Sequence, residues 1–179
     1  MPIYTVQPNI DGLDVLSKFM CDRAHHFRRH DGLGDRSIPM IGPAFSVYSL
    51  SDALTRSPLK SARLTGWKYP VFYGENVLLA VMVLGTDGLE FGGMVWGGLA
   101  NRFVEAARFA ELALKKTRSG FEMRIFECPQ LGIGAIWLAG DRSNRYVEFV
   151  QNNLIEGGPL KLETSVWKLI GQRIDDLAV

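Results

Sequence analysis

The sequence of 179 residues is poor in cysteine and histidine and has almost no excess of charge. It holds two cysteines and three histidines, and its 20 basic and 19 acidic side chains leave a formal net charge of +1. Two cysteines do not form the disulfide framework of a small secreted domain, so we expect reduced thiols and a cytoplasmic protein. The balanced charge excludes a strongly cationic nucleic-acid binder, and we expect no nucleic-acid partner.

Long apolar segments are also lacking. The longest apolar run extends from Val77 to Leu84, far short of the ~20 residues that a membrane-spanning helix needs. The first eight residues, Met-Pro-Ile-Tyr-Thr-Val-Gln-Pro, contain neither a basic segment nor an apolar core, so they do not predict a signal peptide. We therefore expect a soluble protein without a membrane partner.

Complete catalytic motifs are missing as well. The sequence contains no Gly-x-Ser-x-Gly elbow, no P-loop and no dinucleotide-binding fingerprint. Cys128 ends a predicted strand, but a cysteine nucleophile needs a histidine base, and every histidine lies within residues 25–30. No pair of carboxylates stands out as a general acid and base. The sequence therefore predicts neither a catalytic set nor a bound cofactor.

The chain nevertheless has ample material for a core, because 47% of its residues are hydrophobic and a chain of this size can bury about 70% of its surface. Apolar residues recur at helical spacing over residues 14–29, 99–118 and 162–177. Strand-like runs, some separated by turn residues that predict antiparallel hairpins, cover 3–7, 45–50, 67–73, 77–84, 89–96, 121–128, 133–139 and 146–150.

These patterns predict a single α+β domain over residues 1–179. We expect a mixed, mostly antiparallel sheet of about six to seven strands, packed with three helices in a two-layer or partly three-layer sandwich. Residues 31–43, rich in glycine and proline, are expected to form a loop. Pro70 lacks a backbone donor, so its strand is expected at a sheet edge or at a bulge.

A histidine stripe lies on the first predicted helix. Asp22, His26 and His30 are spaced four residues apart and could present two imidazoles and a carboxylate to a metal ion. The favoured alternative is that basic residues gather at a helix C-terminus because positive charge is stabilised there. The same stretch is basic, with Arg23, Arg28, Arg29 and Arg36. It predicts a contact with a phosphate group or a nucleic acid, or else a solvated basic face, which is the more common case.

Two glycines, Gly97 and Gly98, precede the second predicted helix, and Arg102 lies one turn inside it. Backbone N–H groups at such a start can cradle an anion, although glycines there more often let a strand end and pack closely. The order strand, helix, three strands, helix, strand is similar to that of acyl-CoA-dependent acetyltransferases, which bind pyrophosphate at this helix. Their Arg/Gln-x-x-Gly-x-Gly/Ala loop is replaced here by Trp-Gly-Gly-Leu-Ala-Asn, so we do not assign the chain to that family.

Aromatic residues suggest one more surface. Trp67, Tyr69 and Trp96 fall in neighbouring predicted strands and could line one groove, although strand tryptophans more often belong to a core. The leading hypothesis is a non-enzymatic binding module that acts through a sheet surface or its C-terminal helix, with a protein partner or with itself as a homo-oligomer. The alternative is a small transferase that holds a phosphate-bearing, acyl-CoA-like cofactor at Gly97, Gly98 and Arg102.

Overall fold

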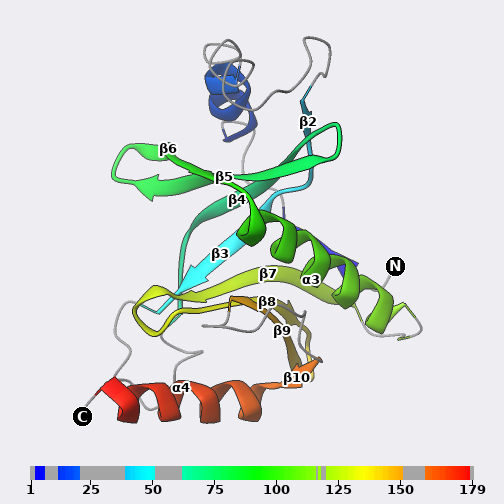
Figure 1. The fold of residues 1–179 in the computed structure, drawn as a ribbon, viewed down its shortest axis with the longest axis vertical. Helices are drawn as coiled ribbons and strands as arrows, with labels where there is room; N and C mark the ends of the chain where they lie inside the picture. The colour runs from blue at the N-terminus through cyan, green and yellow to red at the C-terminus, as the bar shows by residue number, and fades with distance from the viewer. Residues whose placement is uncertain are drawn as a thin grey trace.

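The computed structural model describes residues 3–6, 12–20, 39–50, 62–115, 117, 120–150 and 160–177. Besides the helical residues 12–20, the elements are β1 (Ile3–Tyr4), β2 (Met40–Ile41), β3 (Phe45–Ser49), β4 (Arg63–Tyr73), β5 (Asn76–Gly85), β6 (Gly88–Val95), α3 (Gly98–Leu114), β7 (Phe121–Cys128), the 3-10 helix η1 (Pro129–Leu131), β8 (Ile133–Ala139), β9 (Asn144–Val150), β10 (Lys161–Leu162) and α4 (Glu163–Leu177) (Figure 1).

All the described strands belong to one mixed sheet in the order β10-β9-β8-β7-β3-β4-β5-β6, with β1 added to β7 and β2 to β4. Strand β7 pairs in parallel with β1 and β3, and the other pairs are antiparallel. The predicted α+β class is confirmed, but the predicted six to seven strands become ten. Strand β1 lies within the predicted run 3–7, whereas β2 and β10, with two residues each, are too short for an alternating pattern to reveal them.

Strand β4 is interior, so of the two positions predicted for the Pro70 strand the sheet edge is wrong. The predicted alternative, a bulge, agrees with the pairing, because residues 42–44 lie opposite only residues 69 and 70. Pro70 pairs with Leu79 of β5 on one side. On its other side, β4 pairs first with β3 and then with β2, and the ladder is interrupted between them at residues 42–44. At this interruption, the Gly42 N–H donates to the Pro70 carbonyl. Because the N–H and C=O of a residue in an antiparallel strand point to the same neighbour, the missing donor of Pro70 falls at this break.

Helix α3 covers one face of the sheet, here called the α3 face (Figure 1). Its buried stripe contains three alanines, Ala100, Ala106 and Ala110, whose small side chains let the helix approach the strands closely. Phe103 fills the space between them and makes edge-to-face contacts with Phe45 of β3 and Phe149 of β9, at ring-centroid distances of 5.0 and 5.5 Å. The helix thereby spans strands from both halves of the sheet.

The opposite face, here called the α4 face, carries two separate helical covers. Helical residues 12–20 pack on β4, β5 and β6 through buried Leu16 and Met20, and Phe19 stacks on Phe91 of β6 at 3.6 Å. Helix α4 packs on β7, β8 and β9 through buried Val166 and Ile170. Helices therefore cover both faces, which agrees with the partly three-layer arrangement. Within the described segments, no helix combines the length and apolarity that crossing a bilayer requires.

Phe103 provides a test of the α3 packing. Phe103→Ala removes a side chain with no exposed surface and leaves a cavity among rings that cannot collapse, so we expect a loss of about 3–5 kcal/mol in the free energy of unfolding. Phe109→Ala, on the same helix but 40% exposed, should change it by less than about 1 kcal/mol. Urea denaturation measures both, and equal losses would contradict the assigned burial of the helix.

Candidate binding groove between η1 and the C-terminal helix

The short connection between β7 and β8 forms one wall of the candidate site. Strand β7 ends at Cys128, and Pro129 begins η1 with a backbone angle already suited to a helical turn. Gly132 ends the turn at φ 60°, a left-handed conformation that glycine adopts without steric cost, and its N–H donates to the Pro129 carbonyl. The sequence thus specifies a compact turn here and not an open loop.

Helix α4 forms the other wall, and polar contacts fix its start. The Glu163 carboxylate accepts hydrogen bonds from Asn144 Nδ2 at 2.9 Å and from Trp167 Nε1 at 3.1 Å. Asn144 Oδ1 in turn accepts from Trp137 Nε1 at 3.0 Å. This chain of bonds ties the first turn of α4 to β8 and β9. With Ile170 buried further along, the end of the helix is directed past η1.

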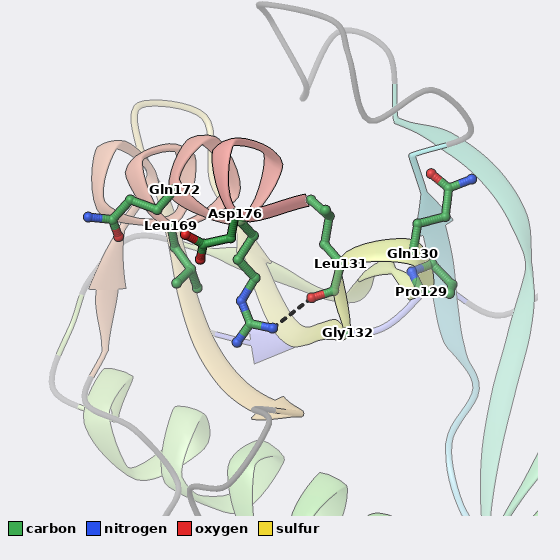
Figure 2. Close-up of a pocket in the computed structure, with 8 residues that line it drawn as sticks. Pro129, Gln130, Leu131, Gly132, Leu169, Gln172 and Asp176 are labelled. Atoms are coloured by element: carbon green, nitrogen blue, oxygen red, sulfur yellow. Dashed lines mark hydrogen bonds between the residues drawn. The ribbon is translucent and has the colours of Figure 1, made fainter. Parts of the chain in front are cut away.

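The two walls enclose an open groove with a volume of about 630 Å³, within the range typical of ligand sites. Arg173 of α4 closes one part of it, because its Nη1 donates to the Leu131 carbonyl at 2.7 Å. Figure 2 shows Gln172 and Gln130 on opposite sides of this bond. The lining residues are Pro129, Gln130, Leu131, Gly132, Leu169, Gln172, Arg173 and Asp176.

The lining residues combine apolar surface, amide groups and opposite charges. Leu131 and Leu169 supply apolar surface, the two glutamines offer amide donors and acceptors, and Arg173 and Asp176 carry opposite charges. The lining includes no histidine, cysteine or hydroxyl group. Cys128 lies directly before η1 but is fully buried. Burial raises the pKa of its thiol, and a hydrogen bond with the Leu131 backbone opposes this only in part, so the thiol stays protonated and unreactive.

The residues of the predicted anion site, Gly97, Gly98 and Arg102, lie at the start of α3. Gly97 caps the helix at φ 67° without a side-chain cap, and Arg102 Nε donates to the Gly98 carbonyl at 3.2 Å. A Cβ atom built on Gly97 or Gly98 would meet nothing within 4 Å, so the first turn is open to a ligand. Cofactor binding at this position stays a prediction.

The three predicted groove aromatics differ in accessibility. Trp67 and Tyr69 lie on the α4 face among the side chains that pack against helical residues 12–20, and Tyr69 has no exposed surface. Trp96, directly after β6, is 44% exposed. Tyr69 therefore belongs to the core, and a groove lined by the other two stays a prediction.

The predicted metal stripe of Asp22, His26 and His30 lies outside the described residues. Within the described part of the chain, no group of three or more histidine, cysteine, aspartate or glutamate side chains is close enough to hold a metal ion.

Comparisons with protein-family models, with curated proteins and with solved structures return no match for this chain. The groove between η1 and α4 is therefore interpreted from its own geometry. Of its two walls, only the C-terminal helix was predicted from the sequence. Element η1 lies in the short connection between the predicted strands 121–128 and 133–139, and the sequence did not predict it.

The burial of Tyr69 predicts a pH dependence of stability. Burial raises its pKa from 10.0 to about 12. Below pH 10 both the folded and the unfolded chain keep the phenol proton, so its stabilising effect is complete. Between pH 10 and 12 the unfolded chain releases the proton first, and this single group costs the fold roughly 2–3 kcal/mol.

Tyr69→Phe removes that loss, so the variant should unfold at higher pH than the wild type in alkaline titrations followed by circular dichroism. At pH 7 it should be as stable or slightly more stable, since the Tyr69 hydroxyl has no hydrogen-bond partner in the described structure. Tyr4→Phe, at a residue 52% exposed, serves as the control and should leave the alkaline midpoint unchanged. An unchanged midpoint in Tyr69→Phe would show that the phenol is not buried.

Proposed function

We propose that this protein is a non-enzymatic binding module that holds a segment of another protein chain in the groove between η1 and α4. The observation that carries this proposal is the combination of an open groove of about 630 Å³ with a lining that is half apolar and half amide or charged. An extended peptide offers the same mixture, because its backbone donors and acceptors alternate with side chains that apolar surface can receive.

The charges of the groove favour a ligand without a large net charge. Arg173 and Asp176 lie one helical turn apart on α4 and compensate one another, and Arg173 is already engaged with the Leu131 carbonyl. Gln130 and Gln172 can each donate to and accept from a peptide backbone. The bound segment can come from a second copy of this chain, which would make the protein the homo-oligomer expected from its sequence.

A peptide selection tests the proposal. Random peptides displayed on phage, together with overlapping peptides of this chain's own sequence, are selected against the full protein, and the affinities of the binders are measured by fluorescence anisotropy. Asp176→Lys removes an acceptor from the groove and places a second cation beside Arg173. We expect it to weaken the selected peptides by about tenfold or more, equivalent to about 1.4 kcal/mol.

Asp175→Lys is the matched control, because it makes the same change of charge at the neighbouring exposed position, which does not line the groove. It should leave peptide affinity within about twofold of the wild type. Gln130→Trp fills the groove from the η1 side and should also weaken binding. Peptides that bind all three variants like the wild type, or a selection that yields no binder, would contradict the proposal.

The open start of α3 favours a second candidate function, a small transferase with a phosphate-bearing cofactor. The uncapped N–H groups of the first turn and the space above Gly97 and Gly98 are its supporting observations. Arg102 is the nearest described cation on the same turn, although its Nε is directed to the Gly98 carbonyl. Saturation with such a cofactor should stabilise the folded protein.

Thermal-shift measurements with coenzyme A and with nucleoside diphosphates distinguish the two functions. A cofactor present at 100 times its dissociation constant adds about 2.7 kcal/mol of stability, and Arg102→Gln should reduce the shift. Absence of any shift with phosphate ligands would remove the transferase candidate and leave the groove proposal intact.

A further inference from the structure

Unsatisfied hydrogen-bonding capacity is concentrated on one face of the sheet. In the described structure, the buried side-chain atoms without a hydrogen-bond partner lie on the α4 face; they are Ser46 Oγ, Trp67 Nε1, Tyr69 Oη, Arg124 Nε and Tyr146 Oη. The Glu148 carboxylate on the same face is not unpaired, because its Oε1 lies 2.9 Å from Lys161 Nζ in an ion pair. Each such group costs roughly 1–3 kcal/mol if it stays unpaired. Their restriction to one face makes this face the candidate position for a bound ligand or for ordered water.

Three of these groups form a row across adjacent strands. Ser46 of β3 pairs with Trp67 of β4. On the other side of β3, Val47 pairs with Ile125 of β7, which places Ser46 level with Arg124. Since neighbouring strands are about 4.8 Å apart, the three residues span about 10 Å. The row crosses from β4, which helical residues 12–20 cover, through β3 to β7, which α4 covers.

Arg124 is held in a fixed orientation at one end of the row. Its guanidinium group lies 4.8 Å from the ring centroid of Tyr48 and 4.9 Å from that of Trp137. Its Nη2 donates to the Glu122 carboxylate. The two rings are neighbours, with centroids 5.3 Å apart, so they contact the guanidinium group from adjacent directions. Glu122 binds at Nη2, and Nε is left without a partner in the described structure.

The row offers donors and lacks acceptors. An indole N–H and a guanidinium N–H can only donate, and the Ser46 hydroxyl can supply a third proton. Donors of this kind match an oxyanion, whose oxygens only accept, while the charge of Arg124 is already shared with Glu122. We propose that Trp67, Ser46 and Arg124 bind a small oxyanion, a carboxylate or phosphate group, on the α4 face between helical residues 12–20 and α4. This site is separate from the groove and does not depend on the proposed peptide binding.

Nuclear magnetic resonance of the indole N–H groups tests the site directly. The chain has four tryptophans, and the Trp67 signal is assigned with the variant Trp67→Phe. The ¹⁵N-labelled protein is titrated with sodium acetate and, separately, with sodium phosphate, both at constant ionic strength against sodium chloride. We expect the Trp67 signal to move saturably with at least one oxyanion while the Trp96 signal stays in place. Which anion saturates the signal distinguishes a carboxylate from a phosphate ligand.

Ser46→Ala separates binding from folding. Because Ser46 Oγ has no partner in the described structure, this variant should be as stable as the wild type and yet bind the oxyanion about tenfold more weakly. Ser49→Ala is the matched control, since Ser49 lies on the α3 face of the same strand and its hydroxyl contacts Thr65 at 3.1 Å; it should bind normally. Arg124→Lys keeps the charge but loses Nε and should abolish binding.

Two results would overturn the site. One is a Trp67 signal that does not saturate with acetate or phosphate beyond the effect of chloride, which would mean that only water satisfies these donors. The other is unchanged oxyanion affinity in Ser46→Ala. The peptide selection described above reads out the groove independently, so failure of one proposal does not imply failure of the other.

Discussion

The parallel pairing of β3 with β7 is the contact on which the rest of the structure depends. It joins the antiparallel strands β4, β5 and β6 to the antiparallel strands β7, β8 and β9 in one sheet. Parallel neighbours cannot be connected by a tight turn, and α3 is part of the long connection that brings the chain from β6 to β7. The same pairing places Ser46 level with Arg124 and leaves two separate helical covers on the α4 face. Gly66 lets β4 and β5 approach closely, because a Cβ there would lie 2.0 Å from the Met82 carbonyl oxygen.

Local patterns in the sequence predict most of the long helices and strands. They fail where the pairing of a strand depends on residues far away in the sequence. Strands β7 and β8 occupy the predicted residues, and α3 and α4 lie within one residue of their predicted starts. The edge position predicted for Pro70 is wrong because the break between β2 and β3 is a property of the partner strand. Pro70 lacks a backbone donor, as the sequence shows, but the position of its strand in the sheet depends on which residues of the partner strand lie opposite.

The same distinction between local patterns and long-range pairing applies to the candidate sites. Two of their signals are local: the glycines before α3 and the apolar periodicity of the C-terminal helix. In the structure, α3 begins at Gly98 and α4 spans Glu163–Leu177. The groove also needs η1, whose only signal is a proline and a glycine on either side of two ordinary residues. The row of Trp67, Ser46 and Arg124 could not be predicted at all, because its members come from three strands whose register only the folded sheet defines.

The two ends of α4 are attached to the sheet with different strength, and this bears on how the groove works. Its first turn shares a chain of hydrogen bonds with Asn144 and Trp137, and its middle is buried through Ile170. Its last turns are joined to η1 by the bond from Arg173 to the Leu131 carbonyl, worth about 1–3 kcal/mol. A ligand in the groove would contact both walls at this weaker end, so binding should stabilise η1 and the helix terminus more than the rest of the fold.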